Sequence, residues 1–228
     1  MIRKIGTLAV MAAVVAMFAV LASAAAAEEW QAEEFPVTLK GTSTDEHTLS
    51  FGTKNPLKCK KGKVTMHATQ TAANQVWTLK PAYVDGECIT EGIGAKFTGF
   101  RNHGEKEGCD YLFNTAGTVD LSCEGTTQVV ADVGPCTVSV PAQTGLKDFS
   151  YKEEGAGATR DYLITLTLTG IKYTITTTPG SSEFLCTAAL DGKHSIGIQY
   201  SDGTYSGSLT VKGSNPANES EDIGIWVE

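Results

Sequence analysis

The chain has 228 residues, of which 18 are basic and 26 acidic, and 41% of its residues are hydrophobic. This length suits one large all-β domain or two small domains. The excess of acidic residues excludes a nucleic acid as the expected partner, because a negatively charged surface repels a phosphate backbone.

The first residues have the pattern of a targeting segment. Arg3 and Lys4 precede an apolar run, and the small residues 25–27 (Ala-Ala-Ala) fit the cleavage pattern of a signal peptide. We therefore expect a signal peptide over residues 1–27 and a secreted domain over residues 28–228, located outside the cell and without a membrane span. Removal of the signal leaves 16 basic against 26 acidic residues, a net charge near −10.

Alternation of apolar and polar residues predicts short strands along the first half of the secreted domain. These strands are expected near residues 35–39, 49–51, 64–69, 76–84, 95–100, 109–113, 119–123, 129–133 and 136–140. Turn residues separate them, as in an antiparallel sheet.

The most charged loop lies between the strand at 95–100 and the hairpin that follows it. His103 lies beside Glu105, Glu107 and Asp110, which forms a local cluster of imidazole and carboxylates. Such a cluster could bind a cation or a partner, so these four residues are a candidate functional loop. A solvated charged loop is the ordinary alternative.

Six cysteines follow the predicted cleavage point, which is an even number in an exported chain and therefore predicts disulfides. They are Cys59, Cys88, Cys109, Cys123, Cys136 and Cys186. Folding of the hairpin about Ala116 sets Cys109 opposite Cys123 and makes the two apolar faces coincide. The other four cysteines leave three pairings, of which Cys59 with Cys88 is preferred because each flanks a strand; Cys136 would then pair with Cys186.

The longest alternating stretch is Tyr162 to Thr178. Its apolar face changes parity after Gly170, so we expect a bulge or bend there, where the absent Cβ permits one. This strand is the element around which the chain is predicted to fold.

Three further strands are expected near residues 184–190, 195–200 and 205–212. The Asp-Gly pairs at 191–192 and 202–203 predict hairpin turns between them. After the signal, no long window has helical periodicity, so few or no helices are expected. The pattern predicts an all-β fold, namely a disulfide-stabilised antiparallel β-sandwich with one large sheet or two packed sheets.

Several segments resemble exported bacterial β-rich proteins of unassigned function. These segments are EEFPVTLKGT (33–42), CTVSVPAQTGL (136–146), GIKYTIT (170–176) and DGTYSGSLTVKG (202–213). The resemblance spans most of the secreted domain and implies an exported β-rich fold, and it supplies no catalytic or binding residues.

Motifs for catalysis and metal binding are absent from the sequence. The G-x-S-x-G elbow of serine hydrolases does not occur; the nearest approach, GKHSIG at 192–197, has Lys193 in place of the first Gly. Cys and His residues lack the spacing of a metal site, so we expect no metal and no cofactor. Asp85, Asp191 and Asp202 each precede Gly, and turn formation accounts for them.

Four aromatic residues could form a sugar-binding platform if they were exposed, although aromatics on alternating strands usually belong to the core. They are Trp77, Tyr83, Tyr200 and Tyr205. We expect a secreted non-catalytic module that binds an extracellular ligand or envelope component or has a structural role. The alternative is an extracellular glycan-active or hydrolytic enzyme whose acids meet only in the fold.

Overall fold

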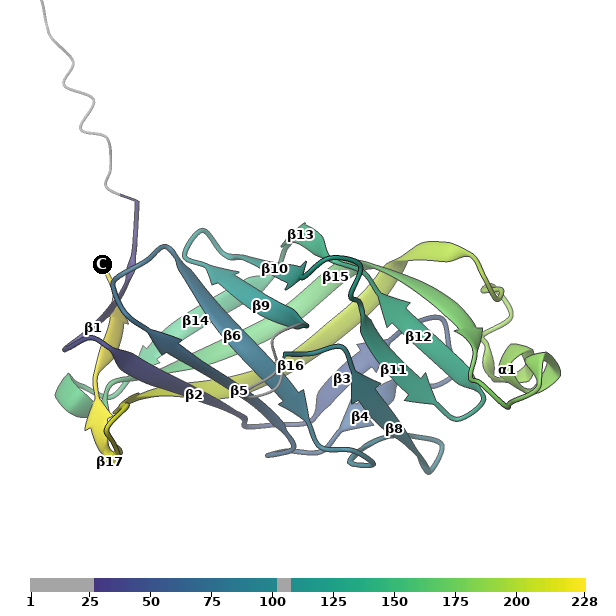
Figure 1. Cartoon of the computed structure of the whole chain (residues 1–228), viewed down its shortest axis with the longest axis horizontal. Helices are drawn as coiled ribbons and strands as arrows, with labels where there is room; N and C mark the ends of the chain where they lie inside the picture. The colour runs from purple at the N-terminus through teal and green to yellow at the C-terminus, as the bar shows by residue number, and fades with distance from the viewer. Residues whose placement is uncertain (1–26, 102–107) are drawn as a thin grey trace, which may run out of the picture.

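Figure 1 shows the computed structural model of the chain, which describes residues 27–101 and 108–228. The predicted signal peptide lies almost entirely outside these residues. Two long antiparallel strands, β15 (Asp161–Thr177) and β16 (Gln199–Asn215), run along the elongated molecule. Each has 17 residues, and they pair from Tyr162 opposite Val211 to Thr174 opposite Gln199.

The predicted long strand and its bulge are confirmed in β15. Gly170 has φ +73°, and the register with β16 shifts between Leu168 and Ile171. Residues with a Cβ seldom adopt this left-handed conformation, so glycine suits the position. The bulge keeps apolar side chains pointing inward on both sides of it, since Leu168 and Ile171 are both buried.

One half of the molecule is a closed barrel of eight strands. The order β16, β3, β4, β7, β8, β11, β12 and β15 returns to β16, which completes the ring. The six shorter strands are β3 (His47–Ser50), β4 (Leu57–Cys59), β7 (Cys88–Thr90), β8 (Ile93–Thr98), β11 (Val129–Val133) and β12 (Cys136–Val140).

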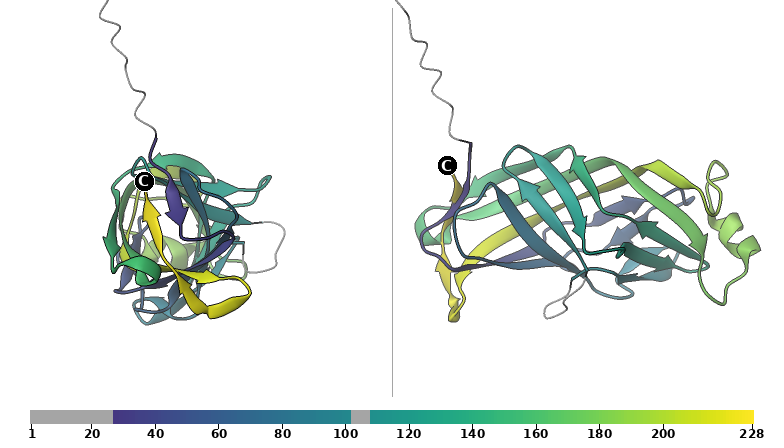
Figure 2. Two further views of the ribbon diagram at one scale, coloured as in Figure 1. Left: turned by 90° about the vertical axis from the view of Figure 1, so that its left-hand side faces the viewer. Right: turned by 45° about the horizontal axis from the view of Figure 1, so that its top comes forward.

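The other half of the molecule extends the same sheet beyond the barrel. From β16 the sheet continues through β2 (Val37–Ser43), β5 (Val64–Gln70), β6 (Val76–Tyr83), β9 (Cys109–Asn114), β10 (Thr118–Cys123) and β13 (Gln143–Leu146). On the opposite side, β14 (Phe149–Glu154) pairs with β15. The view down the long axis in Figure 2 shows that this sheet also curls around an interior.

The prediction of an all-β, disulfide-stabilised fold is confirmed, but the expected sandwich is replaced by a closed barrel with additional strands. A sandwich keeps two separate sheets, whereas here β15 and β16 pair with each other and close the ring. Alternation along a strand shows which side chains face inward and does not reveal which edges pair.

The remaining elements lie at the two ends of the molecule. They are β1 (Trp30–Ala32) paired with β18 (Ile225–Val227), β17 (Asn218–Ile223) paired with β16, a 3₁₀ turn (Gly157–Thr159) and α1 (Glu183–Ala189). Figure 1 places α1 at the end farthest from β1. Among the described residues, the structure has no helix with the length and apolar character needed to cross a bilayer.

Four expectations for the end of the chain are wrong. The segment expected as a strand at 195–200 is mostly turn and loop before β16 begins at Gln199, and Asp191-Gly192 follows α1, so this pair does not join two strands. The segment predicted as a strand at 184–190 is helix α1, whose first turn is capped by the Ser182 hydroxyl accepting from Leu185 N at 3.3 Å. The pair Asp202-Gly203 makes no hairpin, because both residues lie inside β16 where its register with β15 shifts. An extra residue in a strand can thus use the same residue types as a turn.

The structure contains all three favoured disulfides, Cys59–Cys88, Cys109–Cys123 and Cys136–Cys186. The hairpin register is as expected, with Phe113 opposite Val119, Tyr111 opposite Leu121 and Cys109 opposite Cys123. The first bridge joins neighbouring strands β4 and β7, and the third attaches α1 to β12.

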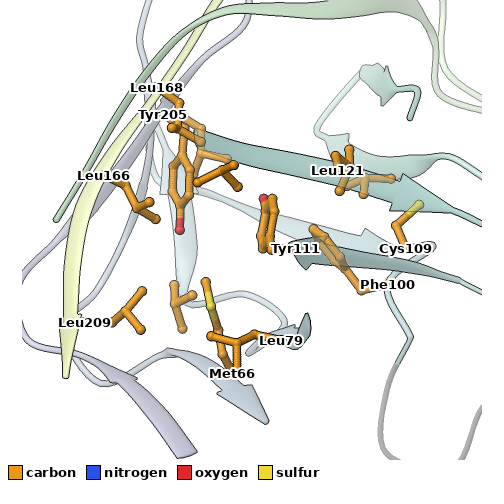
Figure 3. Close-up of a cluster of buried hydrophobic side chains, with 14 of the residues drawn as sticks. Met66, Leu79, Phe100, Cys109, Tyr111, Leu121, Leu166, Leu168, Tyr205 and Leu209 are labelled. Carbon is orange, nitrogen blue, oxygen red and sulfur yellow. The ribbon is translucent and has the colours of Figure 1, made fainter. Parts of the chain in front are cut away.

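The core lies inside the curled sheet. Figure 3 shows Leu166 and Leu168 of β15, Tyr205 and Leu209 of β16, and Tyr111 of β9 converging on it. Trp77 and Tyr205 are buried as expected for core aromatics, whereas Tyr83 and Tyr200 are partly exposed. At the β1 end, Trp30 stacks on Trp77 with ring centroids 4.1 Å apart.

Candidate functional site

The wall of strands has a break beside β15. One edge of β15 pairs with β14 up to Leu166 and with β12 from Thr174 onward. Between these points the described chain places no strand in register on that edge. The segment that would continue the ladder, β13, pairs with β10 instead.

The local sequence explains why β13 leaves β15. Pro141 follows β12 and has no N–H with which to continue the ladder. Gly145 and Asp148 have φ values of +69° and +70°, so the backbone bends sharply at both positions before β14 rejoins β15. The bulge at Gly170 lies in the opposite wall of the break.

The side chain of Gln143 bridges this break. Its Nε2 donates to Lys172 O at 3.3 Å, and its Oε1 accepts from Lys172 N at 2.9 Å. These two bonds satisfy the same backbone groups that a neighbouring strand would satisfy. Gln143 Nε2 is also 3.3 Å from Pro141 O, so the amide is held at both ends.

A surface groove follows the break, and we call it the β13–β15 groove. Its volume is about 680 Å³, within the range of about 300 to 1,000 Å³ typical of ligand pockets. Its walls include Asp120, Ser122, Gln143, Thr144, Lys147, Thr169 and Lys172, and its apolar lining comes from Leu112, Leu121 and Leu146.

The charges that line the β13–β15 groove differ from those of the whole chain. Lys147 and Lys172 are exposed, and neither forms an ion pair with any acidic residue that the structure describes. Asp120 is the carboxylate of the lining, and its Oδ1 accepts from Gly145 N at 2.6 Å. An acidic protein thus has a groove whose lining carries two lysines against one aspartate.

A small apolar chamber adjoins the β13–β15 groove. Leu121, Gln143 and Leu146 line both spaces, so these three side chains form the partition between them. The chamber has a volume of about 30 Å³, which is room for about one or two water molecules. Six aromatic rings line it, those of Phe51, Tyr83, Phe97, Phe100, Tyr111 and Tyr205.

Polar groups next to the chamber form a continuous hydrogen-bond chain. Tyr83 Oη donates to Tyr205 Oη at 3.3 Å, and Tyr205 Oη lies 2.6 Å from His47 Nδ1. His47 Nε2 lies 2.9 Å from Ser208 O, which can only accept, so Nε2 carries the proton and Nδ1 accepts from Tyr205. Burial lowers the pKa of His47, which keeps this chain neutral.

A second cluster, which the sequence analysis missed, surrounds His194. Its Nδ1 lies 2.8 Å from Asp191 Oδ1 and its Nε2 lies 3.0 Å from Asp202 Oδ2, while Tyr173 Oη donates to Asp202 Oδ1 at 2.9 Å. Burial lowers the pKa of His194, but the two carboxylates outweigh this effect and raise it. Both ring nitrogens are occupied, so the imidazole has no free nitrogen with which to act as a base.

Of the predicted functional loop, His103, Glu105 and Glu107 lie outside the described residues. Asp110 is described and buried in β9, with Oδ2 3.5 Å from Arg101 Nε. Burial raises the pKa of the Asp110 carboxyl, against the lowering effect of Arg101. Its Oδ1 has no hydrogen-bond partner among the described residues. Asp110 does not line the β13–β15 groove.

No group of three or more His, Cys, Asp or Glu side chains in the described regions is arranged to hold a metal ion. Comparisons of the chain with protein-family models, with curated proteins and with solved structures find no match.

Proposed function

We propose that this chain is a secreted, non-catalytic binding protein whose ligand occupies the β13–β15 groove. The observation that carries the proposal is the convergence of polar side chains from β10, β13 and β15 on a groove of about 680 Å³ at a break in the sheet. Ligand sites are typically hollows with an apolar lining and a few convergent polar groups.

The chemistry of the lining favours binding over catalysis. A hydrolytic site needs a nucleophile with a base within hydrogen-bond reach, or two carboxyl groups at a defined separation. The hydroxyls of Ser122, Thr144 and Thr169 have no histidine among the lining residues, and Asp120 has one oxygen engaged by the backbone. These groups can donate and accept hydrogen bonds to a ligand without activating it.

Two features support an extracellular location. Three disulfides persist in oxidising compartments, and the first 27 residues have the pattern of a signal peptide. The net charge near −10 of the secreted domain favours solubility and disfavours nucleic acid as the ligand.

For the alternative of a glycan-active enzyme, neighbouring carboxylates in the described regions include Asp191 and Asp202, which both contact His194, and Asp110 and Glu124, which both contact Arg101. Neither pair lines the β13–β15 groove, whose lining contains the single carboxylate of Asp120. The groove is therefore the better-supported site.

The proposal is tested by filling the groove. Thr169 is exposed and lines the groove, whereas Thr176 is exposed on the same strand outside its lining. We would screen the wild-type protein, Thr169→Trp and Thr176→Trp on a glycan array and in pull-down from an envelope fraction. The expected result is a ligand retained by the wild type and Thr176→Trp and lost by Thr169→Trp. Equal binding by all three proteins, or none by the wild type, would contradict the proposal.

A further inference from the structure

Resting on the proposed function, we infer that the β13–β15 groove takes a small anionic amphiphile. Its acidic head, a carboxylate, binds between Lys147 and Lys172, and its alkyl body lies on Leu121 and Leu146 toward Gln143.

Eight of the fifteen lysine and arginine side chains in the described regions form ion pairs with acidic residues, as in Lys58–Glu46 at 2.9 Å and Lys212–Asp161 at 2.9 Å. Lys147 and Lys172 have none there, although they line one groove in an acidic protein. Two unpaired ammonium groups favour an anion. The net charge of the chain disfavours a long polyanion, so the anion is small.

The apolar lining of the groove includes Leu112, which is partly exposed, above Leu121 and Leu146, whose exposed fractions are only 4% and 7%. A ligand with an alkyl body would cover this surface, and each methylene removed from water should increase the affinity about fourfold. A ligand made only of polar groups would leave this surface without an apolar contact.

Gln143 separates the groove from the aromatic chamber, and its amide is held by Lys172 N and O. The alkyl body therefore stops at Gln143 in the wild-type protein. Removal of this side chain joins the groove to the chamber, whose remaining walls are mainly apolar and aromatic. The length of chain that still adds affinity should then increase.

The probe is the series of n-alkyl carboxylates from acetate to decanoate, measured by calorimetry below their micelle concentrations. The Gln143 side-chain NH₂ signal in a ¹H–¹⁵N spectrum reports the location of binding. For the wild type we expect affinity to rise about fourfold per methylene and then to level off. In Gln143→Ala the plateau should move to longer chains.

The role of charge is tested with matched pairs of lysines. The double variant Lys147→Gln/Lys172→Gln should weaken alkanoate binding roughly tenfold or more and leave the weak binding of the corresponding n-alkanols unchanged. Lys61 and Lys96 are exposed lysines outside the groove without an ion-pair partner in the described chain, so Lys61→Gln/Lys96→Gln is the control.

The inference would be overturned by alkanoate affinity independent of chain length, by equal binding of alkanoates and alkylammonium ions, or by equal loss of binding in the two double variants. If no alkanoate binds but Thr169→Trp still abolishes binding of a ligand from the array, this ligand class is wrong and the proposed function stands. If Thr169→Trp also has no effect on binding, both the inferred ligand class and the proposed function are wrong.

Discussion

The two buried histidine side chains, His47 and His194, have opposite pKa shifts because their hydrogen-bond partners differ. His47 lies between a tyrosine hydroxyl and a carbonyl, so burial lowers its pKa and favours the neutral ring. The side chain of His194 is 7% exposed, but it lies between two carboxylates, which raise its pKa and favour the charged ring. His47 should thus destabilise the fold at acidic pH, and His194 should stabilise it there.

The variant His194→Gln tests the charged cluster. A pKa raised above the ordinary value of 6.5 means that the stabilisation is complete below that value and disappears as the pH rises through the raised pKa. We expect His194→Gln to lower the free energy of unfolding by roughly 1 kcal/mol at acidic pH, with a smaller loss under alkaline conditions. Urea unfolding under both conditions measures this difference. Lys193→Gln is the neighbouring control. If His194→Gln lowers the free energy of unfolding equally at acidic and alkaline pH, the charged pairing is contradicted.

The variant Tyr205→Phe tests the neutral chain. It removes the hydroxyl that donates to His47 Nδ1 and leaves a buried acceptor without a donor, which costs about 1 to 3 kcal/mol. Tyr83→Phe removes only the outer end of the chain, where the hydrogen bond is 3.3 Å long. Thermal unfolding should show a larger loss for Tyr205→Phe. An equal or greater loss for Tyr83→Phe would show that the chain does not depend on Tyr205.

At the scale of single residues, the sequence did not predict which side chains meet at the two sites. The sequence predicts turns at Asp191 and Asp202, but Asp202 lies inside β16, and the contact of both residues with His194 depends on the fold. The β13–β15 groove was likewise not predicted, because it depends on β13 pairing with β10 rather than β15. Pro141 was a readable signal, since it ends the ladder at the position where the break begins.

At the scale of secondary-structure elements, β15 illustrates how far alternation can be read. Its length and the bulge at Gly170 follow from period-two patterning alone, because a change of parity requires an extra residue. Helix α1 could not be read in this way. It has seven residues and buries only Cys186, so it is too short to show a helical period, and a disulfide holds it in place.

Substitution of Gly170 tests the bulge. The nearest atom to an added Cβ is Ser201 O at 3.9 Å, so any cost comes from the φ of +73° rather than from a clash. We expect Gly170→Ala to lower the free energy of unfolding by about 1 to 2 kcal/mol. Gly170→Asn should cost less, because asparagine tolerates this conformation better. Thr176→Ala serves as the control in urea unfolding, and a cost-free Gly170→Ala would refute the strained bulge.

At the scale of the whole molecule, β15 and β16 serve both halves, so the interior of the barrel and that of the extended sheet share two strands. Sequence patterning predicted many short antiparallel strands, and a sandwich was the natural reading of them. Closure depends on long-range pairs such as Cys136 opposite Thr177 in β12 and β15. Such contacts leave no local signal, so the sequence could not distinguish a barrel from a sandwich.

Removal of one disulfide at a time tests how covalent bracing contributes. The bridge Cys136–Cys186 closes a span of 50 residues and Cys109–Cys123 one of 14. On the chain-entropy model these contribute about 4 and about 3 kcal/mol. The double alanine variant of the first pair should therefore show the larger fall in melting temperature. A larger fall for the second pair would mean that native packing, rather than loop closure, sets the effect.

Disulfide mapping of the native, non-reduced protein by peptide mass spectrometry tests the fold most directly, because two bridges join strands in register. Cys59 lies opposite Cys88 and Cys109 opposite Cys123, while Cys136–Cys186 fixes α1 to the barrel. We expect these three linked peptides and no free thiol. Any other pairing, or six free thiols in exported protein, would contradict the strand register and with it the groove that the register creates.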